Sequence, residues 1–183
     1  MNVERSHPPI LRLLLAIVLL FGLADGQARA DVSERELTRL QERIDQLSAA
    51  FLARRWDEVA EFVPPHIWEL DRKNHQKSIE VLKSEYIGVI GKGFPENFKF
   101  EIFKATVGKP TFRTSGEGFV YTFIPYQFGA RIDGRLGEIT QSAFAVYEDD
   151  EWYFWLIAES KLATFLDGYY TNIDYKILPK MWR

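Results

Sequence analysis

The chain has 183 residues, of which 46% are hydrophobic, 15% aromatic and 27% charged, and its net charge is −3. This composition is typical of a globular protein and excludes disorder for most of the chain, while the acidic charge gives no electrostatic basis for binding nucleic acid. Because the sequence contains no cysteine, disulfides and thiolate-based zinc or iron–sulfur sites are excluded.

The N-terminus has the features of a secretory leader. A basic segment precedes an apolar run over residues 13–24, which is shorter than the roughly 20 residues that span a bilayer. Ala28 and Ala30 then form the small-x-small pattern that signal peptidase recognises. We therefore expect a signal peptide over residues 1–30, cleavage after Ala30, no membrane span after cleavage and a periplasmic or secreted protein. An uncleaved anchor is the alternative.

A long helix is expected at the start of the mature chain. Ser33 and Glu36 fit the capping box, in which the serine oxygen and the glutamate satisfy free amides of the first turn. Apolar residues then recur at spacings of three and four as far as Pro64 and Pro65, where the helix should stop. The regular stripe lasts only about two heptads, which favours core packing over a coiled coil.

Two further helices are predicted before the composition changes. Pro65 suits the first position of a helix, where its missing amide is not needed. A third helix is expected from about Gln76 to Ile90, with Gly91 and Gly93 ending it.

Residues 97–159 have the character of β-strands. Runs rich in β-branched and aromatic residues are separated at Gly116, Asp133–Gly134 and Asp149–Asp150. The Asp-Gly pair is the strongest hairpin signal, because both central positions of such a turn need positive φ.

Helices followed by an antiparallel meander predict an α+β fold, in which N-terminal helices pack on one face of a four- to five-stranded antiparallel sheet. Residues 31–183 are expected to form a single domain, with a C-terminal tail from about residue 160.

Two segments and one strand pattern resemble the nuclear-transport-factor-2-like superfamily. RRWDEVAEFVPPHIWEL, from Arg54, is similar to the first helix and break of that fold, and EDDEWYFWLI, from Glu148, to its last strand. Tyr121 and Pro125 fit the second strand of similar exported bacterial proteins. The resemblance covers most of residues 34–159. It implies a cystatin-like cone, a curved sheet wrapped around helices with a pocket between them.

That superfamily includes ketosteroid isomerase, scytalone dehydratase and polyketide cyclases, together with binding and assembly modules that have no activity. Fold alone therefore fixes no function.

Few ionisable residues are candidates for chemistry in such a pocket. Asp133, Asp149 and Asp150 lie in predicted turns and are interpreted as turn formers. Glu101 and Glu138 alternate with apolar neighbours and are expected to face solvent.

His66 is the main catalytic candidate. It follows the proline pair, and in one hypothesis it points toward the mouth of the cone, where Tyr121 or Tyr126 completes a weak acid–base pair. The competing interpretation is a surface histidine in a first helical turn. His75 lies in a polar stretch without the spacing of metal ligands, so neither a metal site nor a cofactor is predicted.

The aromatic strand that starts at Glu151 is apolar on both faces. Trp152 and Phe154 point one way, and Tyr153 and Trp155 the other, because side chains alternate along a strand. The N-terminal helices account for one face. The other is expected to be covered by the aromatic C-terminal segment or by a second copy packing sheet to sheet.

Two functions are compatible with this sequence. The first is an exported, non-enzymatic binding or assembly module for a small apolar ligand or an envelope protein. In its ligand form, one continuous pocket is lined by aromatic residues: Trp68, Tyr121, Phe123, Trp152 and Phe154. The alternative is a small isomerase, dehydratase or cyclase that uses His66 and Tyr121. A homodimer through the sheet is compatible with either, and a purely structural dimer whose cavity is vestigial is a third possibility.

Overall fold

The computed structural model describes residues 30–94, 98–132, 134–156 and 159–179. The predicted signal peptide up to residue 29 therefore lies outside the described residues. Within those ranges, none of the helices combines the length and the apolar character that a membrane span requires.

Helix α2 (Glu34–Leu52) begins at the predicted capping box. The Glu36 amide donates to Ser33 Oγ at 3.3 Å, and the Ser33 amide donates to Glu36 Oε2 at 2.8 Å. The apolar stripe of α2 is buried as its periodicity predicts, through residues Leu40, Ile44, Leu47 and Phe51.

The prediction that this helix continues to the proline pair is wrong. The helix ends at Leu52, Arg54 has a φ of 58°, and a short helix α3 (Trp56–Ala60) follows. The break is held by tertiary contacts, since Arg54 Nη1 donates to the Phe94 carbonyl at 3.1 Å. It also redirects the chain so that the Phe62 carbonyl reaches the edge of the sheet.

Helix α4 (Pro65–His75) starts at the predicted proline. Gln76 was expected to begin the third helix, but it has a φ of 54° and ends α4. Helix α5 (Ile79–Gly93) begins instead after Ser78, whose Oγ accepts from the Val81 amide at 3.4 Å. Helix α5 continues past Ile90 and Gly91 and ends at Gly93, the second of the two glycines predicted to end it.

The strands follow the predicted order. They are β1 (Lys99–Ala105), β2 (Arg113–Thr114), β3 (Val120–Ile132), β4 (Arg135–Glu148) and β5 (Glu151–Leu156). All pairings are antiparallel in the order β1-β3-β4-β5, with β2 also on β3.

Both predicted hairpins form. Ile132 lies opposite Arg135, and Glu148 lies opposite Glu151, so each turn has two residues. Asp149 and Asp150 have φ values of 50° and 63°, as a two-residue turn between twisted strands requires. Asp133 lies outside the described residues.

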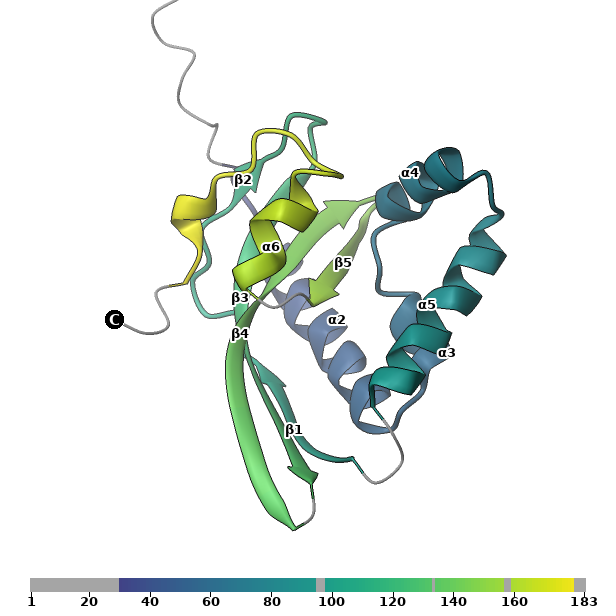
Figure 1. The fold of residues 1–183 in the computed structure, drawn as a ribbon. Coiled ribbons are helices and arrows are strands. Elements are labelled where there is room, and N and C mark those ends of the chain that lie inside the picture. The colour runs from purple at the N-terminus through teal and green to yellow at the C-terminus, as the bar shows by residue number, and fades with distance from the viewer. Residues whose placement is uncertain (1–29, 95–97, 133, 157–158, 180–183) are drawn as a thin grey trace, which may run out of the picture.

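The fold is α+β, with helices followed by a curled antiparallel sheet that forms a half-barrel (Figure 1). Helix α2 packs against one face, where it contacts β1 and β5. The other face is covered by α6 (Glu159–Leu166) and the segment after it, which contains the 3-10 helix η1 (Tyr175–Ile177). Helices α4 and α5 contribute Ile67, Trp68 and Leu82 to the same side. The predicted cover by the C-terminal segment is therefore confirmed.

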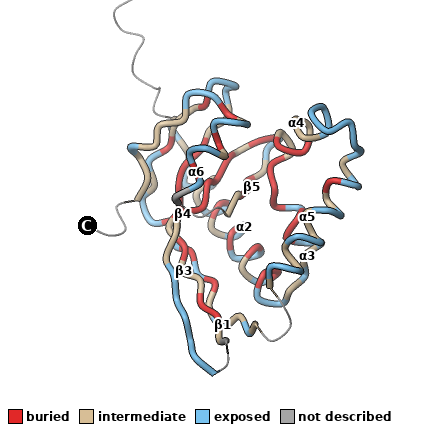
Figure 2. Tube along the Cα trace, viewed as in Figure 1, coloured by how far each residue is buried: buried red, intermediate tan, exposed pale blue. Residues whose placement is uncertain are grey.

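Two hydrophobic clusters result, one on each face of the sheet, and both are fully buried at their centres (Figure 2). The inner cluster lies between α2 and the sheet and includes Ile124 and Ala145. The outer cluster lies between the sheet, the C-terminal segment and helices α4 and α5, and it includes Trp68, Phe144, Leu162 and Leu166.

The β3–β4 hairpin extends beyond β5 as an arm, and β1 pairs along its β3 side as far as Arg131 (Figure 1). Strand β5 pairs with β4 only from Ala143 to Glu148. The outer part of the arm, Arg135 to Ile139, is exposed along its length (Figure 2).

Candidate functional site

The five residues that were expected to line one pocket are divided between the two faces of the sheet. Trp152 and Phe154 belong to the inner cluster, whereas Trp68, Tyr121 and Phe123 belong to the outer cluster. Trp68, at 6%, is the most exposed of the five. The prediction that they share one continuous cavity is therefore wrong.

On the inner face, the space beside the aromatic strand is occupied by the chain's own rings. Trp152 packs against Phe112 and Tyr147, with centroid distances of 5.8 and 5.1 Å. Phe154 packs against Phe62 at 6.4 Å. These are the tilted contacts that aromatic cores favour, so both residues act as core.

On the outer face, the C-terminal segment occupies the corresponding space. Phe144 lies 5.6 Å from Tyr121 and 5.1 Å from Tyr170, ring centre to ring centre. The Tyr121 hydroxyl accepts a hydrogen bond of 2.6 Å from the Asp174 amide. Tyr121 thus anchors the tail rather than presenting its phenol to a pocket.

His66, in the first turn of α4, also contacts the C-terminal segment. Its Nε2 lies 2.9 Å from the Tyr169 carbonyl, which can only accept, so this nitrogen carries the proton. The ring packs against Phe119 and Tyr170, at 5.2 and 5.1 Å. The expected partner Tyr121 is bonded to Asp174 instead, so the hydrogen bonds of this site do not form a His66–Tyr121 acid–base pair.

Tyr126, the other phenol considered for His66, faces the inner cluster. Its hydroxyl donates to Gln141 Oε1 at 2.8 Å, and burial raises the pKa of Tyr126 to about 12. It lies on the opposite side of the sheet from the ring of His66.

Glu148, at the end of β4, is the ionisable residue that the sequence interpretation missed. It is only 8% exposed, and among the described residues its Oε2 has no hydrogen-bond partner. Burial, together with the neighbouring charge of Asp149, raises the pKa of Glu148 to about 7, although the His66 amide donates to the carboxylate. Strand alternation could have found it, because Glu148 shares a face with the buried Phe144 and Val146.

The hydroxyl of Tyr170 is the second buried polar group at this position. The residue is 1% exposed, and within the described part of the chain its hydroxyl also lacks a partner. Burial, and then the charge of Glu148, raises the pKa of Tyr170 well above its ordinary value. Glu148, Tyr170 and His66 therefore form a polar cluster beneath the C-terminal segment, where Glu148 keeps its proton up to about pH 7.

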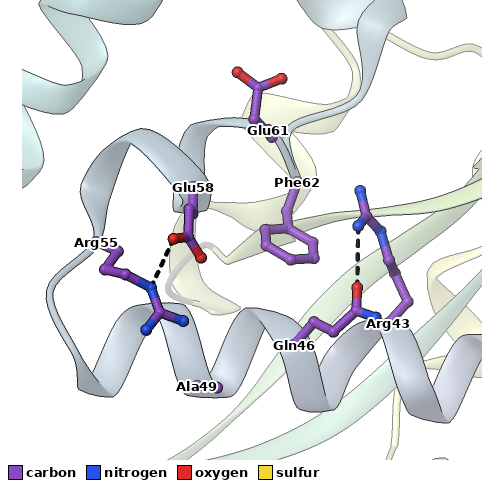
Figure 3. A pocket seen from close by; sticks show the side chains of 7 residues that line it. All are labelled: Arg43, Gln46, Ala49, Arg55, Glu58, Glu61 and Phe62. Carbon is purple, nitrogen blue, oxygen red and sulfur yellow. Dashed lines mark hydrogen bonds and ion pairs between the residues drawn. The ribbon is translucent and has the colours of Figure 1, made fainter.

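A surface groove of about 340 Å³ lies between α2 and α3 (Figure 3). Its floor is Phe62, and the Arg43 guanidinium lies 4.3 Å from the centre of that ring. Arg43 also donates to Gln46 at 3.2 Å and to the Trp152 carbonyl at 3.3 Å.

The other charges around this groove are paired within the chain. Arg55 and Glu58 form an ion pair of 2.8 Å, and Lys83 lies 2.7 Å from the Glu61 carboxylate. Such exposed pairs contribute little to stability. A charged ligand in the groove would nevertheless have to displace one of these ion pairs to reach its side chains.

Two acidic residues that were expected to face solvent do so. Glu101 accepts from Arg131 at 2.7 Å, and Glu138 accepts from Gln127 at 2.8 Å. His75 is exposed at the end of α4, with its Nε2 4.0 Å from the Asp71 carboxylate. Within the described ranges, no group of three or more histidine, aspartate or glutamate side chains is arranged to hold a metal ion.

No family model matches the chain, and no curated protein matches it in sequence. What the chain does must therefore be inferred from its own geometry.

Proposed function

We propose that this chain is an exported, non-enzymatic assembly module of the nuclear-transport-factor-2-like type, which works in the periplasm or outside the cell by holding another protein chain. The α+β half-barrel is consistent with the cone expected for that superfamily. The leader-like N-terminal sequence supports export.

The observation that carries the proposal is the filling of both faces of the sheet. Trp152, Tyr121 and Phe123 are each at most 2% exposed and contact side chains of the same chain. A site for a small apolar ligand would need these rings to line a space, as ligand pockets are lined predominantly by apolar and aromatic groups. Filled faces favour assembly over a ligand cage.

The position of His66 favours the same function over the isomerase, dehydratase or cyclase alternative. A general acid or base must lie within hydrogen-bond reach of the proton that it moves. Here the ring bonds to a main-chain carbonyl and packs between Phe119 and Tyr170. His66 thus supports the C-terminal cover.

Native mass spectrometry of the chain, purified gently from its own host, tests the proposal. We expect the mass of the polypeptide, alone or in assemblies, without a small-molecule excess. A stoichiometric excess of a few hundred daltons would overturn the assembly function in favour of ligand binding.

A cavity variant provides the matched control. Phe154→Ala removes a ring from the inner cluster and should leave a dry apolar space that accepts a small apolar probe such as benzene. Benzene should raise the unfolding temperature of this variant and leave that of the wild type unchanged. N-terminal sequencing of the exported protein tests the leader, with Asp31 as the expected first residue.

A further inference from the structure

The outer part of strand β4 has an open edge. Strand β5 pairs only with residues 143–148 of β4. The first part of β4, from Arg135 to Ser142, belongs to the arm and has no strand on this side among the residues that the structure describes. The opposite side of β4 is paired with β3 along its whole length, from Val120–Tyr147 to Ile132–Arg135.

The register identifies which main-chain groups face outward. Ile132 and Arg135 close a two-residue hairpin, so odd-numbered residues of β4 exchange hydrogen bonds with β3. The amides and carbonyls of Leu136, Glu138 and Thr140 therefore point away from β3. No hydrogen bond from these outward amides to another main-chain group is seen in the described part of the chain.

The chain covers the edge of β5 but leaves this one open. On the outer side of β5, the Phe154 amide donates to the Phe62 carbonyl at 2.7 Å, and Arg43 bonds to the Trp152 carbonyl. The arm has no proline and no bulge on β4, and it exposes large apolar side chains on both faces. Leu136 is 42% exposed and Ile139 is 49% exposed. Open strand edges of this kind are templates for pairing with another strand.

We propose that the open β4 edges of two copies of this chain pair antiparallel to each other, with Gly137 on the two-fold axis, and so join two sheets into one. The inference rests on the proposed assembly function and names a second copy as the chain that is held.

Side-chain chemistry selects the register. If the two-fold axis passed through Glu138, the two Glu138 carboxylates would lie directly opposite each other, which is destabilising. If the axis passed through Ile139, Arg135 of one copy would lie opposite Ala143 of the other. Ala143 is already paired with Leu156 of β5. If the axis passed through Leu136, fewer residues of the two strands would be paired.

The register centred on Gly137 avoids these conflicts. It places Leu136 opposite Glu138 of the second copy and Arg135 opposite Ile139 of the second copy, so like charges are not directly opposed. Gly137 is then the closest point between the strands, in a pair that exchanges no hydrogen bonds. A glycine suits this position, and the space above it is open, since an added Cβ would lie 4.0 Å from its nearest neighbour, the Ala130 carbonyl oxygen.

Cysteine crosslinking of the full-length chain tests this register without interference, because the wild type contains no cysteine. Under mild oxidation Gly137→Cys should form a disulfide-linked dimer, since only residue 137 faces its own copy within the Cα separation of about 4.4–6.8 Å that a disulfide allows. Arg135→Cys and Ile139→Cys should each form no disulfide-linked dimer alone and should crosslink when mixed. Equal crosslinking of all three single variants would overturn the register.

Sedimentation analysis of uncrosslinked protein gives an independent test. Glu138→Pro removes an outward amide without removing a bond to β3, and it should weaken the dimer about tenfold, whereas Glu138→Gln should not. A wild type that stays monomeric at several hundred micromolar, with no Gly137→Cys dimer, would refute the self-pairing but leave assembly with a different protein intact. A tightly retained small molecule would refute the proposed function, even if the crosslink formed.

Discussion

Replacing Glu148 by glutamine should remove most of the pH dependence that this buried carboxyl gives to stability. Burial raises the pKa of Glu148 in the folded protein from its ordinary value of 4.5 to about 7. Between these two values the unfolded chain loses the proton while the folded chain retains it. Folding stability must therefore fall as the pH rises through this window, and the loss is complete above pH 7.

The size of the effect follows from the width of the window. Each unit of difference in pKa corresponds to about 1.4 kcal/mol, so the full shift is worth about 3 kcal/mol. Glu148 is next to the exposed turn at Asp149, where water screens part of the cost, and we therefore expect about 2 kcal/mol. Glutamine keeps the shape and cannot ionise, so Glu148→Gln should be more stable than the wild type by this amount at pH 8 and equal to it near pH 4.

Urea unfolding at pH values from 4 to 8 measures the difference directly. Subtracting the two curves removes the contribution of every other titrating group. Glu138→Gln is the matched control, because Glu138 is exposed on the same strand, and its curve should follow that of the wild type. If Glu148→Gln and the wild type kept parallel curves over this range, the raised pKa would be refuted.

Three further predictions concern the scaffold, each measured as the free energy of unfolding in urea. Trp152→Ala removes an inner-cluster ring that is 1% exposed and should cost about 3–5 kcal/mol; a loss below about 1 kcal/mol would show that the ring is not core. Ser33→Ala breaks the capping box and should cost about 1 kcal/mol, and an unchanged value would mean that the start of α2 contributes nothing. Asp150→Gly relieves a positive φ of 63° and should stabilise the protein by up to about 1 kcal/mol; destabilisation would indicate that the aspartate side chain supports the turn.

Local signals predicted the sheet well. Strand alternation and the turn residues at Asp133–Gly134 and Asp149–Asp150 depend on neighbours in sequence, and both hairpins lie where those signals place them. The capping box at Ser33 is equally local. The break after Leu52 could not be predicted in this way, because it depends on Arg54 reaching the Phe94 carbonyl, a contact 40 positions away in the sequence.

The candidate site was harder to predict, because it depends on register across the sheet. Alternation correctly separated Trp152 from Tyr153 within one strand. Whether Trp152 shares a face with Tyr121 depends on β4, which lies between their strands, and its pairing places Val120 and Tyr147 on the face of Trp152. The division of the aromatics was therefore not visible from single strands, whereas the burial of Glu148 follows from alternation within β4 alone.

Helix α2 and the C-terminal segment, which cover the two faces of the sheet, lie at opposite ends of the chain, and this order affects folding. Helix α2 precedes the sheet, so the inner face can be covered as soon as the strands form. The cover of the outer face is completed only by residues 159–178, which follow all five strands in the chain. Without that segment Tyr121, Phe123 and Phe144 lose part of their cover, and uncovered apolar surface promotes aggregation. A chain truncated within this last segment should therefore have complete strands and need a chaperone to stay in solution.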